Sequence, residues 1–175
     1  GEGGWVGAVG RAGARGGGGR GKNGSRGGGG AAPRGGACGG LPGAFLSAAG
    51  ERGLGDDAIV DGLLGAAAVG VLVAMRAPIS GAIGGCQSEI GVASAMTAAG
   101  LAQLGGGTPE QVIHAAALPL QNLLGLIRDT VARPVEIPRL TRNAVGVPNA
   151  FAAAEIATAG HTMRIHPPEM ATPLI

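Results

Sequence analysis

The chain has 175 residues and a formal net charge of only +2, with 45% hydrophobic and 2% aromatic residues. This length allows one domain with a core of its own, and so small a charge does not by itself indicate a nucleic-acid-binding protein. Because aromatic residues are few, Ala, Leu, Val and Ile must fill the core, which favours closely packed helices over sheets. The two cysteines are too few for a disulfide framework. With no secretory leader recognisable, they predict a reducing, cytoplasmic location.

Residues 1–31 form a low-complexity segment rich in glycine and arginine. Of the 38 glycines, 21 fall within the first 43 residues. Such a segment cannot bury enough apolar surface to offset the loss of chain entropy, so we predict that it is disordered. Arginine–glycine repeats also occur in RNA-binding tails, but Trp5 is the only aromatic residue here and none lies among the arginines. A flexible leader is the main interpretation of residues 1–31. For the function of the whole chain, the alternative is a non-catalytic helical protein whose leader binds RNA.

The second compositional region, residues 32–175, has the pattern of a helical domain. A turn at Leu-Pro-Gly (residues 41–43) should lead into a short helix over residues 44–49. Asp56 is placed to cap a second helix, which should end before Pro78. The run 62–75 is 14 residues long, and a membrane span needs roughly 20 residues. We therefore expect a buried central helix here and no membrane span.

A third helix is predicted over residues 87–104, ending at the three glycines 105–107. The clearest start signal follows it. Thr108 can cap the next helix, Pro109 suits the first helical position, and Gln111 completes a capping box.

Apolar residues recur at helical spacing after this start, and Pro119 within the stripe should kink or break the helix. A last helix is expected from near Pro148 to Gly160. Since no segment has the pattern of a strand, the predicted class is all-α.

The most informative segment chemically is Gly-Ala-Ile-Gly-Gly-Cys-Gln-Ser-Glu-Ile-Gly at residues 81–91. It places Cys86 in a glycine-rich turn directly before a small-residue helix. Glycines let backbone amides approach a ligand closely, and a helix start favours anionic sulfur. Cys86 is therefore a candidate metal ligand, although a lone cysteine is more often a small buried hydrophobic residue. Cys38 is expected to be structural, in a tight turn.

Several motifs in this order resemble the α domain of the iron–sulfur-dependent L-serine dehydratases (L-serine ammonia-lyases). They lie at residues 32–43, 78–91, 106–111, 122–126, 135–138 and 142–144. The resemblance covers roughly residues 32–170 and implies an all-α domain of the serine dehydratase α-chain type, incomplete at both ends. It also implies deamination of L-serine to pyruvate and ammonia, a step of amino-acid degradation and gluconeogenesis. A β domain or subunit would be the partner.

In that family three cysteines hold a [4Fe–4S] cluster whose open iron acts on L-serine as a Lewis acid. Cys86 matches the first ligand position, but the second and third fall on Arg128 and Arg139. Arginine stays cationic and cannot replace a thiolate. The resemblance therefore implies an α component in which the cluster is absent or unstable and the activity is impaired.

Three explanations of the two arginines remain open: a decayed or wrongly translated copy, a non-catalytic relative, or a new anion site beside Cys86. Ser80, Gly81 and Asn143 are the candidate substrate-binding residues. Ser80 can also be a simple turn serine, and Asn143 can simply cap the last helix. Glu89 can be a base or a charge that offsets Arg128, and no catalytic residue is assigned.

Overall fold

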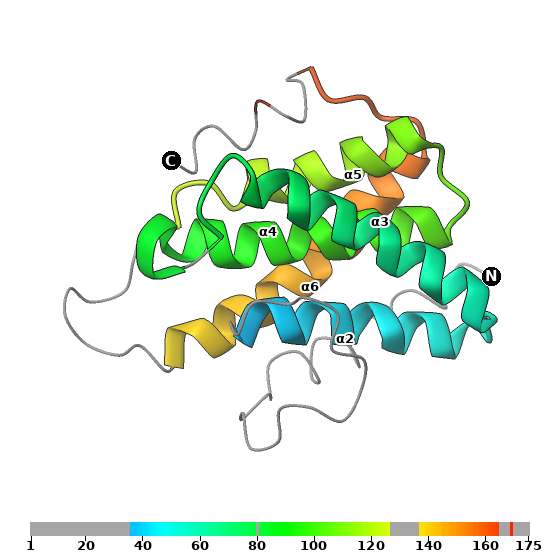
Figure 1. The fold of residues 1–175 in the computed structure, drawn as a ribbon, viewed down its shortest axis with the longest axis horizontal. Coiled ribbons are helices and arrows are strands. Elements are labelled where there is room, and N and C mark those ends of the chain that lie inside the picture. Colours follow the sequence, from blue (N-terminus) through cyan, green and yellow to red (C-terminus); the bar gives the residue numbers. More distant parts are fainter. Residues whose placement is uncertain (1–35, 80, 127–136, 165–168, 170–175) are drawn as a thin grey trace.

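A computed structural model describes residues 36–79, 81–126, 137–164 and 169 of the chain. These residues form a bundle of five helices, shown in Figure 1, and contain no strand. In chain order the helices are α2 (Gly36–Glu51), α3 (Asp56–Ala74), α4 (Gly81–Leu104), α5 (Pro109–Asn122) and α6 (Ile137–Thr158). The predicted all-α class is therefore confirmed for the described part. The predicted disordered leader lies outside the described residues.

α4 is the central helix of the bundle, because α2, α3, α5 and α6 all pack against it. Between residues 88 and 102 only Met96 is partly exposed. Glycine and alanine dominate this stretch, so neighbouring helices approach the backbone of α4 closely. A Cβ placed on Gly100 would lie 3.0 Å from the carbonyl oxygen of Gly62 on α3. Small side chains thus build the tight core that the composition predicted.

α3 packs on one side of α4, and most of its surface is exposed, so the prediction of a buried central helix over residues 62–75 is wrong. Its buried residues all lie on the inner face: Gly62, Ala66 and Val73. A Cβ placed on Gly62 would lie 2.7 Å from Cζ of Phe45, and one on Gly70 would lie 2.9 Å from Cε of Met96. Glycines therefore make the close contacts, and the large aliphatic side chains point outwards. The prediction failed because it took high hydrophobicity as a sign of burial.

By length and composition, α3 is also the one helix among the described residues that is long and apolar enough to cross a membrane. The apolar run considered above began at Gly62, whereas the helix begins at Asp56 and has 19 residues. Of its most apolar 18-residue window, 17% is buried. Core helices and signal sequences pass the same test, so length and composition alone do not establish a span.

The predicted start of α5 is confirmed in detail. Thr108 Oγ1 accepts a hydrogen bond from the backbone N–H of Gln111 at 3.3 Å, and Gln111 Oε1 accepts one from the N–H of Thr108 at 2.8 Å. Pro109 is the first helical residue. At α3 the predicted cap is wrong: Gly55 is the cap, without a side-chain hydrogen bond, and Asp56 is the first residue of the helix. A carboxylate there still interacts favourably with the helix dipole.

α2 and α6 are both longer than predicted. α2 begins at Gly36 and runs through the turn predicted at residues 41–43, and α6 begins at Ile137, well before Pro148. Each helix contains a proline, which removes one backbone hydrogen bond. Buried alanines and a phenylalanine follow the proline in both helices. Their packing against α4 outweighs the local cost, which sequence patterns do not register.

α5 also continues through its proline. Pro119 is fully buried, and the helix ends at Asn122. Of the predicted kink or break at Pro119, the break is therefore wrong and the kink stays a prediction. The turn that follows is held by the N–H of Leu123, which donates to the carbonyl of Pro119 at 3.1 Å. The helix therefore continues beyond Pro119 for less than one turn.

Candidate functional site at the Cys86 loop

The backbone of α4 is interrupted at Gly85, which has φ 77° and ψ −177°. This conformation is essentially restricted to glycine. It divides α4 into a short first segment over residues 81–84 and a long second segment over residues 86–104. The helix predicted over residues 87–104 matches the second segment within one residue. The turn predicted before it is mostly helical, and only Gly85 departs from helical geometry.

Cys86 is the first residue after this junction and has a free thiol that is only 5% exposed. The second helical segment starts here, so the first backbone N–H groups of the central helix lie around this thiol. Cys86 therefore begins a small-residue helix as predicted, but it follows a single non-helical glycine and not a glycine-rich turn. Glu89, one turn further along, is also buried, at 6% exposure.

Ser88 adds a polar atom to this site that the sequence analysis missed. Its side chain is fully buried, and its Oγ finds no hydrogen-bond partner among the described residues. The side chain lies against Gly84: a Cβ placed on Gly84 would lie 2.7 Å from Cβ of Ser88 and 3.3 Å from the carbonyl oxygen of Pro78. An unpartnered buried hydroxyl costs about 1–3 kcal/mol. No sequence pattern indicates that Ser88 is buried, because serine is also common on the exposed faces of helices.

The chain leaving α5 returns to this loop. Gln87 Oε1 accepts a hydrogen bond from the backbone N–H of Gly125 at 3.0 Å. A Cβ placed on Gly85 would lie 3.8 Å from the carbonyl oxygen of Leu126. Gly125 has φ 87°, which lets the chain turn here. The described chain thus reaches the Cys86 junction two residues before Arg128, which itself lies outside the described residues.

α6 is tied to both α4 and α5 by side-chain hydrogen bonds. Ser94 Oγ donates to the carbonyl of Gly146 at 2.7 Å, and Asn122 Nδ2 donates to Asn149 Oδ1 at 2.8 Å. Figure 1 shows the start of α4, the end of α5 and the start of α6 at the same end of the bundle. Arg139 belongs to the first turn of α6, although its side chain lies outside the described part.

The remaining predicted site residues are placed less completely. Gly81 begins α4, and Ser80 lies outside the described residues. Asn143 lies inside α6, so it does not cap that helix. Cys38 lies within α2, which corrects the prediction of a tight turn. The side chains of Asn143 and Cys38 are outside the described part, so the predicted substrate contact of Asn143 and the structural role of Cys38 stay predictions.

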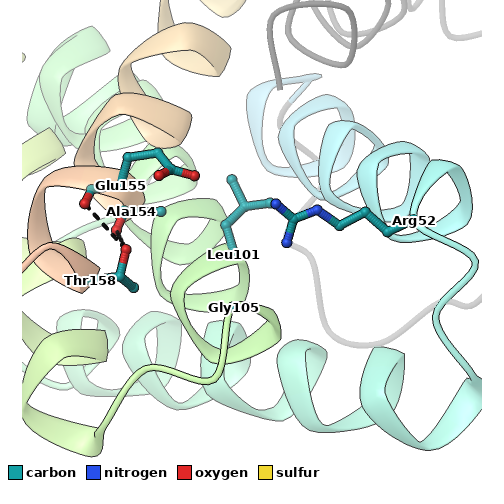
Figure 2. A pocket seen from close by; sticks show the side chains of 6 residues that line it. All are labelled: Arg52, Leu101, Gly105, Ala154, Glu155 and Thr158. Atoms are coloured by element: carbon teal, nitrogen blue, oxygen red, sulfur yellow. Dashed lines mark hydrogen bonds between the residues drawn. The ribbon is translucent and has the colours of Figure 1, made fainter. Parts of the chain in front are cut away.

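The described residues also form a cavity of about 230 Å³, at the other end of α4. Leu101 and Gly105 of α4 and its following turn line it, together with Arg52, which directly follows α2, and residues of α6. Figure 2 shows the guanidinium of Arg52 pointing into this space from one side and Glu155 on the other. About 15 residues, or roughly 22 Å of helix, separate Leu101 from Cys86. None of the predicted site residues lines the cavity.

The donor set at the loop does not fit a [4Fe–4S] cluster held by three cysteine sulfurs. The whole chain has two cysteines, and such clusters depend on thiolate ligation. Within the described residues, no group of three or more His, Cys, Asp or Glu side chains is arranged to hold a metal ion. The cysteines of this chain therefore do not supply the three thiolates that such a cluster requires.

Comparison with known proteins defines the class of protein to which this fold and loop belong. Residues 21–172 match the family model described as serine dehydratase alpha chain, so the chain belongs to that family. It is 45% identical over 130 residues to "Probable L-serine dehydratase, alpha chain" of Bacillus subtilis, a match covering 74% of this chain and 43% of the relative. It is 42% identical over 125 residues to "L-serine dehydratase, alpha chain" of Peptoniphilus asaccharolyticus, covering 71% and 43%.

A third relative is longer. The chain is 46% identical over 124 residues to "L-serine dehydratase TdcG" of Escherichia coli, covering 70% of this chain and 27% of the relative. The chain thus spans less than half the length of these three relatives. The family assignment confirms the resemblance inferred from the ordered motifs.

Proposed function

We propose that this chain supplies the helical scaffold of an L-serine dehydratase α component whose iron–sulfur ligation is largely lost. Deamination of L-serine to pyruvate and ammonia by this chain is accordingly impaired. The observation that carries the proposal is the Cys86 junction. It keeps a buried thiol at the start of the central helix, with the chain at Leu126 packed beside it, yet the whole chain has only one other cysteine.

The loss of ligation follows from the residues at the other two ligand positions. By resemblance to the family these are Arg128 and Arg139. A guanidinium is always protonated and only donates hydrogen bonds, so neither residue can act as a thiolate. Arginine side chains at both ligand positions favour a carboxylate or phosphate over iron.

The scaffold still offers groups that can bind a substrate. Ser80, Gly81 and Asn143 are the proposed contacts for L-serine, and the buried hydroxyl of Ser88 lies in the same segment. The names of two relatives include the words alpha chain, which supports a β domain or subunit as partner. We propose the cytoplasm as the location.

The proposal is tested by coupling pyruvate formation to lactate dehydrogenase under anaerobic conditions. Because the chain spans 43% of the Bacillus subtilis relative, the assay uses two chimeras of that α chain, produced together with its β partner. Both carry the matching 130 residues of this chain. One chimera keeps Arg128 and Arg139, and the other carries Arg128→Cys and Arg139→Cys. We expect pyruvate formation only from the second.

The unmodified Bacillus subtilis α chain with its partner is the positive control for the assay. A third chimera, carrying the two cysteines together with Cys86→Ser, controls for ligation through the first position and should be inactive. Pyruvate formed at the control rate by the chimera that keeps both arginines would contradict the proposed impairment. Inactivity of the two-cysteine chimera in a folded, iron-loaded state would contradict the retained scaffold.

A further inference from the structure

From Val60 to the C-cap at Met75, the outer face of α3 is mostly apolar and exposed. Its large side chains are exposed by 37–78%, and they are Val60, Leu63, Leu64, Val71, Leu72 and Met75. No charged residue lies between Asp61 and Arg76. A helix that is apolar all round is normally buried all round, whereas the core contacts only the glycine-rich inner face of α3. The outer face therefore has the character of an interface.

The spacing on this face is suited to another helix. Exposed apolar residues follow each other at alternating steps of four and three: Val60, Leu64, Ala67, Val71 and Ala74. This is an average period of about 3.5 residues, which keeps a seam facing a partner helix. A stripe at helical spacing also suits a lipid surface, so the self-complementarity and the end charges are what favour a partner helix.

The same face is complementary to itself when two copies run antiparallel. A two-fold axis between Ala67 and Ala68 would set these small residues against each other at the centre. Leu64 would then face the partner's Val71, and Val60 would face the partner's Met75. Small side chains at the middle allow close approach, and large ones at both ends fill the wider space. A surface patch that complements itself is what a two-fold dimer requires.

The charges at the two ends of α3 favour the same direction. Asp56, Asp57 and Asp61 are exposed in the first two turns, and Arg76 is exposed just after the last turn. Antiparallel pairing brings Arg76 of each copy to the acidic end of the other. Parallel pairing would instead place the three aspartates of both copies side by side, which is repulsive.

We propose that α3 is a self-association surface, through which two copies of this chain pair antiparallel about Ala67 and Ala68. The occupant of the exposed apolar face is thus a second copy of the chain, and not a membrane. This inference does not depend on the proposed enzymatic function, because it uses no residue of the Cys86 loop.

The test measures the dimer dissociation constant of the full chain by sedimentation equilibrium. The wild-type chain should be dimeric. Leu64→Lys places a charge within the seam and should raise the dissociation constant at least about tenfold. Ile113→Lys on α5 is the matched control, because Ile113 is 45% exposed, and it should leave the constant unchanged. Circular dichroism shows that each variant retains its helices.

A double variant tests the register. In the antiparallel pair, Leu64→Lys and Val71→Asp in one chain set each new lysine opposite a new aspartate, so dimerisation should recover relative to Leu64→Lys alone. In a parallel pair the two lysines would meet, and there would be no recovery. The proposal is overturned by a monomeric wild type, by a Leu64→Lys variant that still dimerises, or by a double variant that does not recover. Binding of a monomeric wild type to phosphatidylglycerol vesicles would likewise overturn it and assign the face to lipid.

Discussion

α3 and α4 are both apolar helices rich in small residues, yet they occupy opposite environments. α4 is enclosed by four helices, whereas α3 touches the core only along its inner face. The less uniformly apolar helix is the central one, because α4 carries Ser88, Glu89, Ser94 and Thr97 in buried positions. The hydrophobicity of a helix therefore indicates that its surface packs against a partner. It does not indicate whether that partner belongs to the same chain.

The contrast between α3 and α4 is tested most strongly by replacing one leucine on each helix with alanine. Leu101 on α4 is 1% exposed and Leu64 on α3 is 63% exposed. Leu101→Ala should lower the free energy of unfolding by about 2–5 kcal/mol, because it leaves a cavity in the core. Leu64→Ala should change it by about 0.5 kcal/mol or less in the monomer. Urea denaturation at one low protein concentration measures both, since dimerisation would make stability depend on concentration. Equal losses would contradict the assignment of α4 as the core helix.

Substitutions on the inner face of α3 should lower the free energy of unfolding strongly, whereas substitutions on its outer face should change it little. Gly62→Leu inserts a side chain where even a Cβ would lie 2.7 Å from the ring of Phe45, and should cost about 2–3 kcal/mol. Gly43→Ala on α2 is the control, because nothing lies within 4 Å of a Cβ there. It should raise the stability by about 0.5–1 kcal/mol, as expected for a helix interior. Thermal unfolding distinguishes the two, and a tolerated Gly62→Leu would break the account of close packing.

The junction in α4 should resist any side chain. Gly85→Ala forces alanine to φ 77° and ψ −177°, so we expect a loss of about 1–2 kcal/mol from backbone strain. The backbone at Gly85 also lies next to Leu126. The variant should therefore increase proteolytic cleavage after α5 as well. Unchanged stability would mean that the junction is not held as described.

The smallest effects should come from two buried serines of α4. Ser94 donates a hydrogen bond to Gly146, so Ser94→Ala should lower the stability by about 1 kcal/mol. Ser88 has no partner among the described residues, so Ser88→Ala should be neutral or raise the stability by up to about 1 kcal/mol. The difference between the two variants in urea is the quantity to compare. A larger loss for Ser88→Ala would show that its hydroxyl has a partner.

Local signals in the sequence predicted local structure well. The capping box at Thr108 and the end of α4 at Leu104 depend on residues close in the chain, and both are confirmed. The prolines at 119 and 148 were misjudged, because distant packing outweighs their local cost. The position of α3 was missed for a similar reason, since its composition does not reveal which neighbours it has.

The candidate site was predictable to the same degree. Cys86 was found because glycines and a cysteine lie together in the sequence, and the structure keeps them at one junction. The contacts of Gln87 with Gly125 and of Gly85 with Leu126 join segments 38 or more residues apart. Spacing in the sequence cannot reveal such contacts.

The central proposal is that this chain keeps the helical scaffold of a serine dehydratase α domain but only one of the three cysteine ligands, Cys86, that the family uses for its cluster. Iron and acid-labile sulfide per chain, measured after anaerobic reconstitution, test it most directly. The wild-type chain should bind far fewer than four irons, and the Arg128→Cys/Arg139→Cys variant should bind markedly more. Four irons and four sulfides on each wild-type chain would contradict the claim.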